Sequence, residues 1–326
     1  MPPSLPEVFD LVAGDFLARN IVFLGSSPTS ASILSGLIQV NAPIVQVVTR
    51  EKKRRGRGSQ LVSTPVEEIA SEAGIECIYS LDDLCVEIDF GIVVAFGKII
   101  PPRILDKIPM VNIHFSLLPK YRGAAPVERA VINGDSHTGV SLMEVANELD
   151  AGRVFDSYEI EISKSESIDE IMTRLGERGL QILMGHMAQI GETFTFSKNS
   201  LGEPKPQEGE ASYAPKIDKS ELKINLNDDI EHIQNLTRLG RAWLEFGGER
   251  LRIDKSAVAN ERLCAFMQNF PVGSIVNLDN RILTKAQTGV LELLEVTPSG
   301  KRRMDATSWY RGASSRAKSS EALIVH

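Results

Sequence analysis

Residues 20–28 read NIVFLGSSP, an apolar run that stops at a turn of small residues. A short apolar run bounded by such a turn predicts a strand that is buried on both faces. The spacing of apolar residues over 31–40 predicts a helix directly after it. The turn lacks the G-x-G-x-x-G pattern of dinucleotide sites, so no dinucleotide is expected there. The stretch therefore predicts the first strand and helix of an α/β sheet.

The alternation of strands and helices continues along the chain. Residues 65–73, PVEEIASEA, combine helical spacing with early acidic residues, and a longer helical pattern covers 171–190. Further strands are predicted by apolar runs at 44–48, 90–95, 111–114 and 139–143. Strands that are almost wholly apolar are typical of a parallel sheet covered on both faces. The sequence thus predicts an α/β domain with an open, mainly parallel sheet.

Residues 201–216, LGEPKPQEGEASYAPK, form a polar stretch rich in Pro and Gly that predicts a linker, and the pattern of apolar residues changes after it. A helical segment over 229–239 follows, and then closely spaced strand patterns predict a small β-barrel, at 242–246, 250–253, 273–276, 281–284 and 290–294. The predicted organisation is an N-terminal extension, an α/β domain, a linker and a C-terminal β-barrel domain, over residues 1–19, 20–200, 201–216 and 217–326.

Composition excludes several classes of protein. Of the 326 residues, 42% are apolar and 24% are charged, which is ordinary for a folded globular protein and not for a fibrous one. We find no apolar run of about 18 residues for a membrane span, and acidic residues occupy the start where a signal peptide needs basic ones. The cysteines, Cys77, Cys85 and Cys264, form no C-x-x-C pair. We therefore expect reduced thiols, no zinc site and a cytoplasmic location.

Charge is unevenly distributed. The net charge of the chain is −7. The part from residue 216 onward contains 17 basic and 14 acidic residues, whereas the preceding part contains 19 basic and 29 acidic residues. Inside that acidic part, residues 52–58 read KKRRGRG. This basic run predicts contact with a polyanion if it faces the same way as the C-terminal part. A solvated loop is the alternative interpretation.

The chemistry is concentrated in residues 112–135, NIHFSLLPKYRGAAPVERAVINGD. Asn112 and His114 are two positions apart on a predicted strand, so their side chains share a face at the ligand-binding end of the sheet. An amide that can donate to an oxyanion beside an imidazole that can move a proton is the combination that acyl transfer needs. A structural, buried histidine is the alternative. Asp150, in the turn 148–152, is expected to orient His114, or else is simply a turn residue.

Two further features refine this prediction. No nucleophile elbow occurs and no cysteine accompanies a histidine, so direct transfer between two bound substrates is favoured over a covalent intermediate. The rigid, apolar loop after His114 is suited to form the wall of a site for a flat heteroaromatic ligand, with its residues Ser116, Leu117, Leu118 and Pro119.

The sequence resembles the methionyl-tRNA formyltransferases over nearly its whole length. The segment 112–135 carries the resemblance, together with GVSLMEVANELDAG at 139–152, IVFLGSS at 21–27, VVAFGKIIP at 93–101 and YAPKI at 213–217. The resemblance implies a Rossmann-like formyltransferase domain followed by an OB-like β-barrel. It also implies transfer of a formyl group from 10-formyltetrahydrofolate to the amino group of methionine on initiator tRNA, with no metal.

Carried over by position, the resemblance assigns catalysis to Asn112, His114 and Asp150, and folate binding to residues 116–119. The family's tRNA loop falls on roughly residues 50–60, where EKKRRGR replaces the usual P-D-R-P-x-G-R, and Phe115 replaces Pro or Gly. We expect tRNA contacts from the basic residues Lys52, Lys53, Arg54, Arg55, Arg57, Lys301, Arg302 and Arg303. A monomer that does not bind membranes is expected.

Three rival functions stay open at this point. The catalytic motif also fits a folate-dependent formyltransferase that acts on an amino sugar linked to a nucleotide, and this enzyme would share a barrel-like second domain. A glycinamide ribonucleotide formyltransferase would not need a basic barrel. A non-catalytic RNA-binding protein on an enzyme scaffold would not need all three polar residues.

Overall fold

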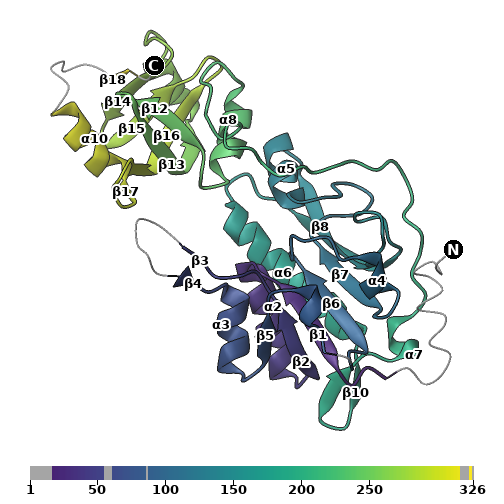
Figure 1. Ribbon diagram of the computed structural model, residues 1–326. Helices are drawn as coiled ribbons and strands as arrows, with labels where there is room; N and C mark the ends of the chain where they lie inside the picture. Colours follow the sequence, from purple (N-terminus) through teal and green to yellow (C-terminus); the bar gives the residue numbers. More distant parts are fainter. Residues whose placement is uncertain (1–16, 55–60, 86, 316–322, 325–326) are drawn as a thin grey trace. The chain divides into compact units, whose positions relative to one another are not determined.

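The computed structural model describes residues 17–54, 61–85, 87–315 and 323–324 (Figure 1). The chain divides into two compact units. The first joins the chain up to Pro126 with Thr138–Ile160 and Met172–Pro215, and the second joins Val127–His137 and Glu161–Ile171 with the chain from Lys216 onward. Two segments that precede the predicted linker therefore belong to the same unit as the C-terminal strands.

The first unit is built on the sheet that the sequence predicts. Its strand order is β5-β2-β1-β6-β7-β8-β9. The pairings β1–β2, β1–β6, β6–β7 and β2–β5 are parallel, and β7–β8 is antiparallel. The strands are β1 (Ile21–Gly25), β2 (Ile44–Val48), β5 (Glu76–Ile78), β6 (Phe90–Val94), β7 (Met110–His114), β8 (His137–Glu144) and β9 (Val154–Glu161). Every residue of β1 and β6 is buried, as expected for central strands.

The helices of the first unit begin where the sequence supplies caps. Helix α2 (Pro28–Gln39) has Ser27 and Ser30 in a capping box with a proline at the first position, and Thr64 caps α3 (Pro65–Glu72). Helix α6 (Ile168–Gly185) packs on β7 through Gly179, where an added Cβ would lie 2.8 Å from the Ile113 side chain. Shorter helices are η1 (Leu81–Asp83), α4 (Pro102–Leu105) and α7 (Lys198–Leu201).

The helix predicted over 171–190 extends too far. Helix α6 ends at Gly185, and β10 (Ala188–Ile190) pairs instead with β11 (Thr193–Thr195). The turn between them contains Gly191 at φ 64°, a left-handed conformation that glycine adopts without strain. The helical spacing of the apolar residues continues through the hairpin, which is why the pattern alone misplaced the end of the helix.

The second unit contains an antiparallel sheet with the order β12-β13-β16-β15-β14-β18, and β17 pairs with β16. Its strands are β12 (Trp243–Phe246), β13 (Glu249–Val258), β14 (Ser274–Leu278), β15 (Arg281–Lys285), β16 (Val290–Pro298), β17 (Met304–Asp305) and β18 (Leu323–Ile324). The β14–β15 hairpin turns at Asp279 and Asn280, both with positive φ, as a two-residue hairpin requires. The predicted barrel strands are confirmed.

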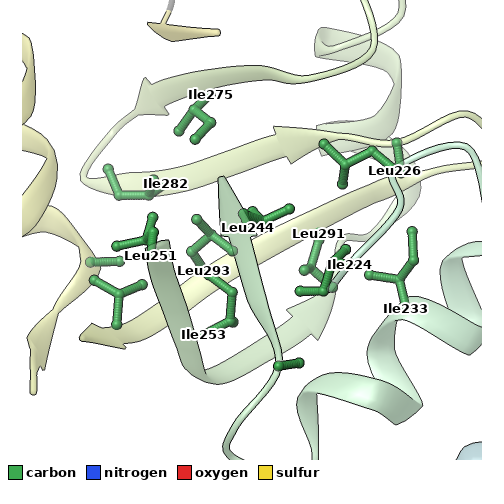
Figure 2. Close-up of a cluster of buried hydrophobic side chains, with 14 of the residues drawn as sticks. Ile224, Leu226, Ile233, Leu244, Leu251, Ile253, Ile275, Ile282, Leu291 and Leu293 are labelled. Carbon is green, nitrogen blue, oxygen red and sulfur yellow. The ribbon is translucent and has the colours of Figure 1, made fainter. Parts of the chain in front are cut away.

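The core of the second unit is mainly aliphatic, with Trp309 as its buried aromatic residue. Figure 2 shows side chains of the sheet and of α8 meeting in one cluster, which includes Ile224, Leu226, Ile233, Leu244, Leu251, Ile253, Ile275, Ile282, Leu291 and Leu293. The helices of this unit are α5 (Pro126–Asn133), α8 (Ile230–Thr237), α9 (Glu261–Phe266) and α10 (Ala306–Ser314). The sequence pattern did not predict α9 or α10, which start at the side-chain caps Asn260 and Asp305.

Two kinds of feature are absent from the residues that the structure describes. Across residues 17–54, 61–85, 87–315 and 323–324, no helix has the length and apolar character that crossing a bilayer demands. Over the same ranges, no group of three or more His, Cys, Asp or Glu side chains is arranged to bind a metal ion.

Candidate active site

The site begins on strand β7. Asn112 and His114 stand opposite Met143 and Ser141 of β8, at the carboxyl end of the strand. Asn112 is half-buried and His114 is 6% exposed. Because strand residues two positions apart share a face, the amide and the imidazole project to the same side of the sheet. The structure therefore places this pair as the sequence predicts.

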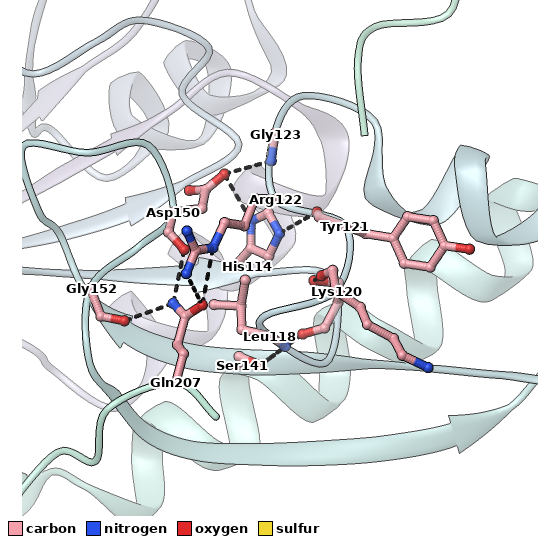
Figure 3. Close-up of polar contacts among 11 residues, drawn as sticks. His114, Leu118, Lys120, Tyr121, Arg122, Gly123, Ser141, Asp150, Gly152 and Gln207 are labelled. Carbon is pink, nitrogen blue, oxygen red and sulfur yellow. Dashed lines mark hydrogen bonds and ion pairs between the residues drawn. The ribbon is translucent and has the colours of Figure 1, made fainter. Parts of the chain in front are cut away.

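Both ring nitrogens of His114 face oxygen atoms (Figure 3). Nε2 lies 3.0 Å from the carbonyl oxygen of Tyr121, and Nδ1 lies 3.6 Å from Oδ2 of Asp150. A carbonyl oxygen can only accept, so Nε2 carries the proton of that hydrogen bond. The Nε2 hydrogen bond orients the ring, and Nδ1 lies within ion-pair distance of Asp150 when the ring is protonated, so the predicted proximity of Asp150 to His114 is a feature of the structure.

Asp150 sits in a turn that is fixed at several points. Its φ is 51°, in the left-handed region, and its Oδ2 accepts a hydrogen bond of 2.8 Å from the amide of Gly123. At the base of the turn Arg153 makes two hydrogen bonds to the buried carboxylate of Glu144, at 2.8 and 2.9 Å. A Cβ on Gly152 would lie 2.0 Å from the Glu144 carbonyl oxygen, so any larger residue would displace the turn. The turn therefore directs one carboxylate at His114.

The loop after His114 is held by hydroxyl groups. Ser116 Oγ donates to the Lys120 carbonyl at 2.6 Å, and Ser141 Oγ donates to the Ser116 carbonyl at 2.7 Å. Ser116 is fully buried, so its hydroxyl acts inside the loop. The other three residues that the sequence assigns to folate, Leu117, Leu118 and Pro119, are half-buried and keep exposed surface.

The stretch predicted as a linker also lines this loop. Arg122 donates its amide to the Ser212 carbonyl at 2.8 Å, and its own carbonyl accepts from the Ala214 amide at 2.7 Å. Lys205 and Val154 exchange two backbone hydrogen bonds of 2.8 Å, next to the Asp150 turn. Residues 205–214 thus support both loops of the site, which a polar stretch without periodicity did not reveal.

Comparison with known proteins identifies the family. The model for formyl transferase matches residues 19–186, and the model for the formyl transferase C-terminal domain matches residues 216–314. A methionyl-tRNA formyltransferase of Lactobacillus delbrueckii subsp. bulgaricus is 33% identical over 325 residues, covering 94% of this chain and 99% of that protein. One from Thermodesulfovibrio yellowstonii is 33% identical over 91% of this chain and 96% of its own. The chain belongs to the methionyl-tRNA formyltransferase family.

Solved structures share the fold at low sequence identity. WlaRD, a sugar 3N-formyltransferase solved in the presence of dTDP and 5-N-formyl-THF, has a TM-score of 0.58 at 19% identity, covering 89% of this chain and 100% of its own. The methionyl-tRNA formyltransferase of Clostridium thermocellum has a TM-score of 0.52 at 16% identity, and the match covers 74% of this chain and 95% of that protein. The predicted Rossmann-like domain with an OB-like second domain is confirmed.

The basic residues expected to bind tRNA in this formyltransferase have different surroundings. Lys52 pairs with Glu67 at 3.1 Å. Lys53 and Arg54 form the short strand β3 (Lys53–Arg54), which pairs with β4 (Leu61–Val62), and Arg55 and Arg57 lie outside the described residues. In the second unit Lys301 and Arg302 are exposed, whereas Arg303 forms an ion pair with Glu295.

Proposed function

We propose that the protein transfers a formyl group from 10-formyltetrahydrofolate to the amino group of methionine on initiator tRNA. The observation that carries the proposal is the placement of His114 between Tyr121 and Asp150, beside Asn112, in a chain that matches methionyl-tRNA formyltransferases along both its parts. We also propose that it acts as a monomer in the cytoplasm.

The proposed reaction is a direct transfer. The neutral methionine nitrogen attacks the formyl carbon, a C–N bond forms, and negative charge develops on the formyl oxygen. Asn112 donates a hydrogen bond to that oxygen, where a preorganised donor is worth about 3–4 kcal/mol of barrier. The bond from the formyl carbon to the folate nitrogen then breaks, while one proton passes from the attacking nitrogen to the folate nitrogen. His114, oriented by Asp150, carries this proton.

The choice of donor and acceptor is supported by separate features. WlaRD, which shares the fold, was solved with a formylated tetrahydrofolate, and the half-buried Leu117, Leu118 and Pro119 offer an apolar wall of the kind a pterin requires. For the acceptor, relatives that match nearly the full length of the chain are methionyl-tRNA formyltransferases. Exposed Lys301 and Arg302 supply cations suited to phosphates.

An acceptor assay tests the proposal. Full-length protein is incubated with 10-formyltetrahydrofolate labelled in the formyl group and with charged initiator tRNA, and label in precipitated tRNA is counted. We expect incorporation that requires the methionyl group and is lost in the His114→Ala variant. Uncharged tRNA and a dTDP-linked amino sugar serve as comparison acceptors. Label transferred to the sugar and not to the tRNA would establish the rival function.

A further inference from the structure

Gln207 connects the two loops that position the catalytic carboxylate. Its Nε2 donates to the carbonyl of Asp150 at 2.9 Å and to the carbonyl of Gly152 at 2.8 Å. Its Oε1 accepts from Nε of Arg122 at 3.1 Å and from Nη2 at 2.7 Å. Figure 3 shows this side chain with its contacts to Asp150, Gly152 and Arg122. All four hydrogen-bonding sites of the amide are therefore used.

These contacts leave the amide with one orientation. A guanidinium only donates and a carbonyl only accepts, so the oxygen of Gln207 must face Arg122 and the nitrogen must face the turn. Arg122 is itself held in place, because its backbone pairs with residues 212 and 214 and its side chain is 12% exposed. The amide of the next residue, Gly123, donates to the Asp150 carboxylate. Gln207 and Gly123 thus hold the main chain and the side chain of Asp150 against one loop.

Asp150 needs such support because its backbone is strained. A non-glycine residue at φ 51° is disfavoured and persists only where its surroundings determine the conformation. The two carbonyls that Gln207 binds belong to Asp150 and Gly152, on either side of Ala151 within the turn. Without them the turn can relax, and the carboxylate would rotate away from Nδ1 of His114, which is already 3.6 Å distant.

We propose that Gln207 is a positioning residue that sets the direction of the Asp150 carboxylate toward His114. Its hydrogen bonds go to Arg122, Asp150 and Gly152 and none goes to His114, so it acts through Asp150 and is not a catalytic residue. The inference rests on the proposed role of His114 and Asp150 in formyl transfer. It assigns a function to a residue in the stretch that the sequence presents only as a linker.

The substitution Gln207→Glu separates positioning from simple attachment to Arg122. A glutamate has the same length and pairs with Arg122 more strongly, but it has no N–H to donate, so two carbonyls would face a carboxylate. We expect kcat to fall roughly tenfold or more, because small displacements of a catalytic group are costly, while KM for tRNA and for the folate stays within about twofold. If the glutamate variant folds poorly, Gln207→Met replaces it in the test. Methionine is of similar length and uncharged and has no N–H to donate, so it should give the same loss.

The control is the neighbouring exposed Glu208, substituted as Glu208→Gln, which should retain the wild-type kcat. A second readout is the ¹H–¹⁵N spectrum of the imidazoles, in which the His114 Nδ1 signal, assigned with His114→Ala, should move in Gln207→Glu and stay in Glu208→Gln. An unchanged kcat and an unchanged His114 signal in both Gln207 variants would overturn the proposal. If the wild type proved inactive on methionyl-tRNA, the formylation proposal alone would fail, because the His114 signal would still report on positioning.

Discussion

Lys52 is bound to Glu67: its Nζ lies 3.1 Å from Oε1 of a carboxylate that is only 7% exposed. The same oxygen accepts a hydrogen bond of 2.8 Å from the hydroxyl of Tyr79. Burial opposes ionisation of Glu67, but the Tyr79 hydroxyl and the Lys52 ammonium together hold its pKa below the ordinary 4.5. The basic run therefore starts with a lysine anchored to the fold, directly before the strand β3.

The first prediction concerns the acid stability that this anchor provides. Glu67→Gln should lower the free energy of unfolding by about 1 kcal/mol at pH 7, a modest value since Lys52 is half exposed. A carboxyl whose folded pKa is depressed stabilises above its unfolded pKa and loses this contribution as pH falls through the folded pKa. The difference between the proteins should therefore begin to shrink as pH falls below 4.5 and vanish once pH has passed the lower folded pKa, as measured by urea unfolding across pH. Glu68→Gln, its exposed neighbour, is the control, and an equal effect there would contradict the assignment.

The second prediction concerns the ionisation of Tyr79, the other partner of Glu67. The hydrogen bond to this carboxylate, with burial, raises the pKa of Tyr79 from 10.0 to about 12. Since the folded pKa is raised, the stabilisation is complete below pH 10 and is lost as pH rises toward 12. In an ultraviolet titration near 295 nm, one tyrosine should ionise late in the wild type and earlier in Glu67→Gln. Identical titration curves would show that the two side chains do not interact in solution.

The third prediction concerns catalysis. Asn112→Ala, His114→Ala and Asp150→Ala should each lower kcat by roughly 100-fold or more while the fold is retained, because they remove the oxyanion donor, the proton carrier and the carboxylate that orients it. The exposed His137, which lies outside the site, provides the matched control as His137→Ala. A residue whose alanine variant keeps near-normal turnover does not belong to the catalytic group.

The fourth prediction separates free from paired cations on the second unit. Lys301 and Arg302 are exposed, so a double alanine variant should bind tRNA more weakly and with a flatter dependence on salt, by about 0.9 in slope for each phosphate that is no longer neutralised. The charge-matched control is a double alanine variant of Arg252 and Arg281, whose guanidiniums pair with Asp254 and Glu292. Binding measured from low to high salt checks this expectation, and equal slopes for the two variants would assign both regions to solvated surface.

Patterns of short range in the sequence were sufficient for much of the fold and for part of the site. The spacing of two between Asn112 and His114 fixes their common face on any strand, and the apolar runs of β1 and β6 mark central strands. The closely spaced strand patterns at 273–276 and 281–284 were equally reliable, because β14 and β15 follow them.

Features that depend on tertiary contacts could not be predicted in the same way. The turn at 148–152 allowed Asp150 to approach His114 or to be simply a turn residue, and the choice depends on a left-handed backbone and on the register of β7 with β8, neither of which a pattern encodes. Gln207 lies in a polar, Pro-rich stretch with no periodicity, so its four hydrogen bonds become visible only in the folded chain.

The fifth prediction tests whether the Asp150 turn must keep its geometry. An added Cβ on Gly152 would lie 2.0 Å from the carbonyl oxygen of Glu144, a backbone atom of β8 that cannot rotate aside. Gly152→Ala must therefore displace the turn, and we expect a loss of about 1–3 kcal/mol in stability together with a fall in kcat of roughly tenfold or more.

The matched control for this variant is Gly312→Ala in helix α10. No atom lies within 4 Å of its added Cβ, so alanine should fit there and stabilise the helix by up to about 1 kcal/mol, with kcat unchanged. Thermal unfolding and formylation kinetics of both variants give the comparison. If Gly152→Ala destabilised the protein but formylated at the wild-type rate, catalysis would not require the observed turn, and the role assigned to the direction of the Asp150 carboxylate would be wrong.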